Sequence, residues 1–285
     1  MSLYLVGKYE ICNVLTHFFN TNNILPAPDP STDINTYIDE NTVHNSIIIN
    51  IVSNNNEVEF PSAAQNKGRV VSCLLLDTID DAIKWKGFQE KLSINRKEGI
   101  SILAQWNPHY LQIGKSWLKV LRKKVTLQSN DWMADKVGKS HLLDKLAKGC
   151  QTCIYFGHGR VQKMVGYHGI SAEEISQSDR GAPITCFLSF SCHHLHQETE
   201  HLSFGEELIM SHKVAVFWGS RIATDKTINT QLVKICQYQY IATDNMTMNE
   251  WINNVAEAVE RESNPLLSTL WKSYSLLGNP LLPLN

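Results

Sequence analysis

Short apolar runs alternate with helical segments along the second half of the chain, and this alternation constrains the fold more than any other feature. The runs at Thr152–Phe156, Ile184–Phe190 and Val214–Trp218 have the length and composition of buried strands. The segments between them carry helix-start signals, including the capping boxes Ser171–Glu174 and Ser203–Glu206. Strands separated by helices pair in parallel, so the pattern predicts an α/β fold with a mostly parallel central sheet and helices on both faces.

The composition narrows the classes of partner. Of the 285 residues, 43% are hydrophobic and 19% are charged, which is typical of a globular chain and unlike a disordered one. The formal net charge is -2, so there is no basic excess to bind phosphates. We therefore expect neither nucleic acid nor an anionic membrane as a partner.

The seven cysteines are odd in number and scattered, which is typical of free thiols in a reducing compartment. The N-terminal residues lack a basic region and a cleavage site, and Lys8 and Glu10 interrupt their apolar stretch. No apolar run approaches the roughly 20 residues that a membrane span needs. These features predict a cytoplasmic location.

Residues 1–65 differ from the rest because they hold Asn-rich and Pro-rich patches. Two apolar runs, Ser46–Val52 and Glu57–Phe60, flank an Asn triplet and predict a β-hairpin. We therefore expect a small β-containing N-terminal subdomain over residues 1–99 and a second, larger domain over residues 100–285.

A histidine and a cysteine follow two consecutive predicted strands. His158 lies two residues after the Thr152–Phe156 run, and Cys192 lies two residues after the Ile184–Phe190 run. Because the carboxyl ends of parallel strands meet at one edge of a sheet, these two side chains are expected to face each other. A neighbouring imidazole increases the thiolate fraction of a cysteine, whose reference pKa is about 8.5. The pair therefore predicts a thiol nucleophile and its base, with His158 later protonating the leaving amine.

The glycine after the histidine adds to this hypothesis. Gly159 has no side chain that would block a substrate carbonyl. The backbone amides of Gly159 and Cys192 are therefore candidates for an oxyanion hole, an element worth about 3 kcal/mol per donor.

A set of short segments resembles the caspase-like (clan CD) cysteine peptidases, in particular their gingipain and CHAT branches. The resemblance covers roughly residues 100–285 and is carried, in order, by Tyr155-Phe-Gly-His-Gly159, Leu188-Ser-Phe-Ser-Cys192, Ser203-Phe-Gly-Glu206, Val214-Ala-Val-Phe-Trp-Gly219 and Leu276-Leu-Gly-Asn-Pro280. It implies a three-layer caspase-like sandwich, with residues 1–99 as a subdomain or a degenerate second half.

The resemblance also implies a function. It predicts an intracellular endopeptidase that cleaves a protein partner through a Cys192/His158 dyad and needs no metal or organic cofactor. Relatives often act in regulated bacterial pathways such as defence or programmed death, so we expect a regulatory protein partner as well.

Histidines at 193, 194 and 196 depart from the small residues that often follow the nucleophile in such peptidases. If the His193–His194 pair fills the substrate site, the chain is instead a catalytically inactive caspase-like module that binds a partner through the same crevice. A second alternative is a zinc-dependent hydrolase that uses Cys150, Cys153 and the histidines. We do not favour it, because Cys153 begins a strand, whereas Cys192 and these histidines are expected near the opposite, carboxyl edge of the sheet.

Five residues are candidates for selecting the substrate residue beside the scissile bond. Acidic side chains suited to a basic substrate residue are Asp131, Asp179 and Asp225, whereas Arg221 suits an acidic one. Trp218, at the end of the strand predicted beside the nucleophile strand, is a candidate pocket wall or a plain core residue.

Overall fold

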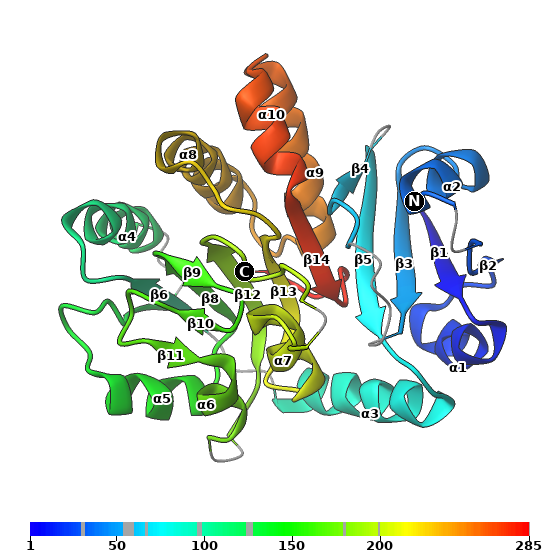
Figure 1. The fold of residues 1–285 in the computed structure, drawn as a ribbon, viewed down its shortest axis with the longest axis horizontal. Helices are drawn as coiled ribbons and strands as arrows, with labels where there is room; N and C mark the ends of the chain where they lie inside the picture. The colour runs from blue at the N-terminus through cyan, green and yellow to red at the C-terminus, as the bar shows by residue number, and fades with distance from the viewer. Residues whose placement is uncertain are drawn as a thin grey trace.

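One continuous sheet of eleven strands runs through the centre of the computed structural model, which describes residues 1–29, 32–53, 60–65, 68–95, 99–123, 128–178, 181–198 and 200–284 (Figure 1). In spatial order the strands are β2 (Ile24–Pro26), β1 (Ser2–Gly7), β3 (Ser46–Val52), β5 (Arg69–Leu75), β14 (Tyr274–Gly278), β13 (Val214–Ser220), β12 (Ile184–Phe190), β8 (Thr152–Phe156), β6 (Ile100–Ala104) and β7 (Ser129–Asp131), with β4 (Ala64–Gln65) paired to β5.

Most neighbouring strands in this sheet run parallel, as predicted. The antiparallel pairs are β13 with β14 and β4 with β5. Strand β12 lies between β13 and β8 and is parallel to both, and β8 is parallel to β6 on its other side. The carboxyl ends of β6, β8, β12 and β13 therefore meet at one edge of the sheet.

Helices cover both faces of the sheet (Figure 1). Over β6, β8, β12 and β13, one face carries α4 (Pro108–Leu121), α8 (Lys226–Ala242), α9 (Met248–Arg261) and α10 (Pro265–Lys272), and the other carries α5 (Lys139–Ala147), α6 (Ala172–Ser176) and α7 (Phe204–Met210). Over β1, β3 and β5, α1 (Tyr9–Phe19) and α3 (Ile79–Asn95) pack on one face against Leu5, Ile49 and Leu74, and α2 (Ile34–Asn41) packs on the opposite face against Val6, Ile48 and Val71. None of the helices in the described part of the chain combines the length and apolar character that a membrane span requires.

The strands are apolar on both sides because both faces are covered. In β8, Ile154 and Phe156 pack into the core beneath α4 and α8, whereas Cys153 and Tyr155 pack into the core on the opposite face. Successive side chains of a strand point to opposite faces, so one continuous apolar run supplies two cores. The predicted three-layer α/β architecture is confirmed.

A second, small sheet extends from the end of β8. Its strands are β9 (Gly159–Arg160), β10 (Lys163–Met164) and β11 (Ile170–Ser171), paired antiparallel. Both predicted capping boxes are present: Ser171 begins α6 with Glu174, and Ser203 begins α7 with Glu206. These caps fix where the chain enters the two helices behind the site.

The predicted N-terminal hairpin is wrong for its first strand. Both edges of β3 are taken by parallel neighbours, β1 and β5, so β3 belongs to the large sheet. Its run of consecutive isoleucines suits a strand buried on both faces rather than an exposed hairpin. Residues 57–59 of the second predicted strand lie outside the described residues. The sheet continues across the boundary predicted at residues 99 and 100, because β14 pairs with β5.

Candidate active site

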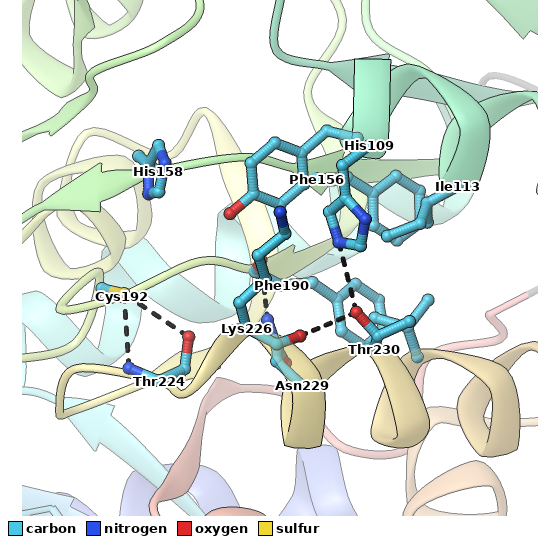
Figure 2. A pocket seen from close by; sticks show the side chains of 12 residues that line it. His109, Ile113, Phe156, His158, Phe190, Cys192, Thr224, Lys226, Asn229 and Thr230 are labelled. Carbon is cyan, nitrogen blue, oxygen red and sulfur yellow. Dashed lines mark hydrogen bonds between the residues drawn. The ribbon is translucent and has the colours of Figure 1, made fainter. Parts of the chain in front are cut away.

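Cys192 lies just beyond the carboxyl end of β12. All seven cysteines lie within the described residues, and Cys192 is the one that is not buried. Its sulfur receives a hydrogen bond from the backbone amide of Thr224 (N to Sγ 3.3 Å) and lies 3.4 Å from the Thr224 hydroxyl oxygen. Thr224 belongs to the loop between β13 and α8, so the neighbouring strand end holds the sulfur in place (Figure 2).

His158 leaves the carboxyl end of β8, the strand beside β12, and its side chain is exposed. Its backbone is held at three points: its amide donates to Gln105 Oε1 (2.7 Å), and its carbonyl accepts from the Tyr155 hydroxyl (2.9 Å) and the Val165 amide (3.1 Å). The imidazole packs edge-to-face on Tyr110, with ring centroids 5.4 Å apart. A fixed backbone and one ring contact leave both imidazole nitrogens accessible.

Position 159 requires a glycine because the loop that carries Cys192 passes close to its Cα atom. A Cβ at this position would lie 2.7 Å from two atoms of the His194 ring and closer still to the Cys192 carbonyl oxygen. Gly159 pairs with Met164 next to the hydrogen-bonded His158–Val165 pair. Because hydrogen-bonded and non-hydrogen-bonded pairs alternate, the Gly159 amide faces away from β10. Within the described part of the chain, the Cys192 amide donates no hydrogen bond either.

A pocket opens beside these groups, between α4 and α8. Its volume is about 400 Å³, open solvent at its mouth included. Figure 2 shows the side chains around it, with Cys192 and His158 at one end. The lining residues are His109, Tyr110, Ile113, Phe156, His158, Phe190, Cys192, Thr224, Lys226, Asn229, Thr230 and Val233. The predicted cysteine and histidine therefore share one pocket.

The three histidines after Cys192 do not line this pocket. His194 is fully buried beneath the loop, where its ring stacks between Tyr155 and Phe204. Its Nδ1 lies 2.7 Å from the Ser189 hydroxyl and its Nε2 lies 3.3 Å from the Lys163 carbonyl oxygen. His196 is exposed with its Nδ1 3.1 Å from the Arg221 carbonyl oxygen, and the half-buried His193 packs against its ring. The expectation that these side chains fill the substrate site is not supported.

The burial of His194 predicts a pH-dependent stability. Burial lowers its pKa to about 3, so the folded state keeps this imidazole neutral while the unfolded chain protonates it below about pH 6.5. The free energy of unfolding should therefore fall by up to about 1.4 kcal/mol per pH unit as the pH drops below 6.5. Urea denaturation between pH 7.5 and 5.5 measures this slope.

The control for that slope is His194→Gln, because burial also lowers the pKa of His212 and adds to the effect in the same direction. The variant should show a shallower slope than the wild type. An NMR signal of the His194 ring that titrates near pH 6.5 in the folded protein would contradict this assignment.

Four of the five predicted specificity residues lie outside the pocket. Trp218 is fully buried, with its ring stacked on Tyr274 and edge-to-face with Trp251, so it is a core residue and not a pocket wall. Asp131 lies on β7, at the far edge of the sheet, and pairs with Lys136 at 3.5 Å. Asp179 lies outside the described residues.

Two other candidates come from the loop after β13 but bind the protein itself. The Asp225 carboxylate accepts the Thr227 and Ile228 amides (2.8 and 2.9 Å) and so caps α8. The Arg221 guanidinium donates to the carbonyl oxygens of Lys272 (2.7 Å) and Ser273 (3.2 Å) at the end of α10. Neither side chain lines the pocket.

Sequence reasoning missed Gln105, Thr224 and the α4 side of the pocket. Gln105 follows β6, and Thr224 lies in the loop after β13. Strand β6 is the neighbour of β8 and β13 is the neighbour of β12, so both residues lie at the carboxyl ends of strands that flank the pair. The rule that selected His158 and Cys192 applies to them equally. The missing information was the strand order, which determines which strand ends are neighbours.

The two cysteines of the Cys150–Cys153 motif are buried at the other end of β8. Burial raises the pKa of the Cys153 thiol. Among the described residues, no group of three or more histidine, cysteine or carboxylate side chains is placed to hold a metal ion. The residues present therefore offer no donor set for the zinc alternative in this part of the chain.

Solved structures share this fold. The Arg-specific cysteine proteinase gingipain R matches with a TM-score of 0.77 at 10% identity, covering 99% of this chain and 78% of that chain. A complex of the RgpB pro- and mature domains of Porphyromonas gingivalis matches with a TM-score of 0.76 at 11% identity, covering 99% and 80%. Separase in the Saccharomyces cerevisiae separase–securin complex matches with a TM-score of 0.57 at 11% identity, covering 85% and 16%. The predicted caspase-like fold is confirmed.

Sequence identities of 10–11% to these structures show the fold but do not assign a family, so the family rests on a family model. No curated protein sequence matches the chain significantly. Residues 63–285, however, match the model of peptidase family C25, which is well over half of the chain. The chain belongs to peptidase family C25, the gingipain family, and is a cysteine peptidase.

Proposed function

We propose that this chain is an intracellular endopeptidase that cleaves a protein partner through a Cys192/His158 dyad. The observation that carries the proposal is that both side chains line one pocket at the carboxyl ends of two adjacent parallel strands. The exposure of Cys192 supports it, because the other six cysteines are buried and inaccessible to substrate.

The proposed reaction is acyl transfer through a thioester. His158 accepts the thiol proton as the Cys192 sulfur attacks the scissile carbonyl carbon, and the carbonyl oxygen becomes an oxyanion. His158 then donates that proton to the leaving amine as the carbon–nitrogen bond breaks. Water then attacks the carbonyl carbon of the thioester while His158 accepts a proton from it. The tetrahedral intermediate formed in this step collapses by breaking the carbon–sulfur bond, which releases the carboxylic acid product. His158 returns the proton to the sulfur and restores the thiol.

The free amides of Gly159 and Cys192 are proposed to bind the oxyanion. Neither amide is used within the β9–β10 ladder or the loop contacts, and Gly159 is packed against the Cys192 carbonyl. Preorganised donors of this kind stabilise the charge that develops in the transition state. A screen of fluorogenic peptides, with and without prior alkylation by iodoacetamide, tests the proposed function. Turnover that survives complete alkylation of Cys192 would contradict it.

Thr224 is proposed to position the nucleophile. Replacing it with valine removes the hydroxyl near the sulfur but keeps the backbone amide bond to it. Because one hydrogen bond is worth about 0.5–1.5 kcal/mol, kcat/KM should fall roughly 2- to 10-fold. The rate of Cys192 alkylation at pH 7 should fall with it, while KM changes little.

The matched control is Thr224→Ser, which keeps the hydroxyl and should recover most of both rates. A valine variant that is alkylated as fast as the wild type would show that the hydroxyl does not act on the sulfur.

We also propose that a protein partner regulates this peptidase, in a pathway such as defence or programmed death. The support is that two structural neighbours are described as complexes, one of pro- and mature domains and one of separase with securin. Activity of the purified chain should rise or fall when lysate of its own source is added. Equal activity with and without lysate would count against this part of the proposal.

A further inference from the structure

The pocket beside Cys192 determines which substrate residue can precede the cut, if the proposed function holds. The sulfur lies at one end of the pocket, and the remaining lining comes from α4, α8 and the ends of β8 and β12 (Figure 2). When the sulfur contacts the scissile carbonyl carbon, the Cβ atom of the residue on the amino side of that bond is only two bonds from that carbon. This pocket is therefore the site into which that side chain fits.

The charge of the pocket disfavours a basic side chain. None of the twelve lining residues is an aspartate or glutamate, and Lys226 is among them. No ion pair joins Lys226 to a carboxylate in the described part of the chain. The Lys226 charge also acts on His109, which lies on α4: burial and, secondarily, this charge lower the pKa of His109. An arginine or lysine of the substrate would meet a like charge and no acceptor carboxylate.

The inner surface of the pocket is apolar. Phe156 and Phe190 form a stacked pair, with centroids 5.3 Å apart and rings inclined by 17°, and both are almost fully buried. Ile113 from α4 and Val233 from α8 add aliphatic surface on the two sides. An apolar side chain bound here gains roughly 25 cal/mol for each Å² of apolar surface that it removes from water.

Two polar side chains of the pocket, Asn229 and Thr230, already have partners within the protein. Asn229 Nδ2 donates to the Phe190 carbonyl (3.4 Å), and its Oδ1 accepts from the Tyr274 hydroxyl (2.9 Å). The Thr230 hydroxyl donates to the Lys226 carbonyl (2.7 Å) and lies 3.2 Å from His109 Nε2. These two side chains are therefore already engaged when a polar substrate side chain enters.

We propose that this pocket accepts a large apolar side chain, such as leucine, methionine or phenylalanine, on the amino side of the scissile bond and rejects arginine and lysine. The chain then differs in specificity from gingipain R, which is described as Arg-specific and shares the fold at 10% identity. The fold carries the nucleophile and its base, whereas α4 and α8 supply the pocket.

The test is a set of fluorogenic tetrapeptides that differ only in the last residue, which is leucine, methionine, phenylalanine, arginine, lysine or aspartate. The three apolar peptides should give kcat/KM at least about 10-fold above the arginine and lysine peptides. The same order should hold for the rates at which peptidyl chloromethyl ketones with these residues modify Cys192. A preference for arginine, lysine or aspartate, or no preference, overturns the assignment.

Two variants sharpen the result. Lys226→Glu should raise the ratio of arginine to leucine turnover by about 10-fold, because it replaces the repelling charge with an attracting one. Lys234→Glu makes the same charge change on an exposed α8 residue outside the pocket and should leave that ratio unchanged. Equal ratios in the wild type and both variants would show that Lys226 does not act on the substrate.

Iodoacetamide separates failure of this inference from failure of the proposed function, because it reacts with the thiol without using the pocket. If Cys192 is alkylated fastest but basic peptides are cut best, only the specificity is wrong. If Cys192 is not selectively alkylated and neither the peptides nor the chloromethyl ketones react, both proposals fail.

Discussion

Replacing Cys192 with alanine should abolish peptide turnover while the protein stays folded. The sulfur is the proposed nucleophile, and loss of a catalytic nucleophile lowers kcat by about 10⁴-fold or more. The side chain is only half-buried, and its sulfur contacts the amide and hydroxyl of Thr224. The free energy of unfolding should therefore change by less than about 1 kcal/mol. Initial rates and urea denaturation measure the two effects separately.

The controls for this variant are Cys150→Ser and Cys153→Ser. Both residues are buried at the amino end of β8, away from the pocket, so activity should stay within a few-fold even where stability falls. A Cys192→Ala variant that still cuts the substrate would refute the assignment. Complete loss in the Cys150 and Cys153 variants, with zinc bound to the wild type, would favour the metal hydrolase.

The second large effect is expected from His158→Ala. Removing a general acid–base group costs about 10²- to 10⁴-fold in rate, and this imidazole is proposed to move the proton in every step. Iodoacetamide labelling of Cys192 near neutral pH should also slow, because the thiol loses its base. The side chain is exposed, so the fold should be unaffected.

The matched control for this variant is His196→Ala, an exposed histidine on the same loop as Cys192 that does not line the pocket. It should retain both the turnover and the labelling rate of the wild type. Equal labelling of Cys192 in wild type and His158→Ala protein would remove His158 from the dyad.

The features predicted correctly from sequence are those encoded by contiguous residues. The apolar runs that become β8 and β12 are long enough for strands buried on both faces, and His158 and Cys192, which follow them, indicate the sheet edge where the proposed site lies. Because these strands are adjacent and parallel, His158 and Cys192 reach the same pocket. Local pattern and one topological rule were sufficient for this part.

The features missed depend on strand order and on tertiary contacts. The pocket is lined by residues of α4 and α8, which follow β6 and β13 in the chain. The sequence does not reveal that β6 and β13 flank the pair formed by β8 and β12. The apolar run that ends at Trp218 makes this residue a candidate pocket wall, but β13 continues to Ser220 and directs the Trp218 ring into the core. Asp225 carries the right charge for a basic substrate, yet the start of α8 uses that carboxylate as a cap.

The identity of the nucleophile is tested most directly by trapping it with a peptidyl chloromethyl ketone and mapping the modified residue by peptide mass spectrometry. The proposed mechanism predicts one covalent adduct per chain, located on Cys192, with parallel loss of turnover. An adduct on another residue, or complete inhibition with Cys192 unmodified, would contradict it.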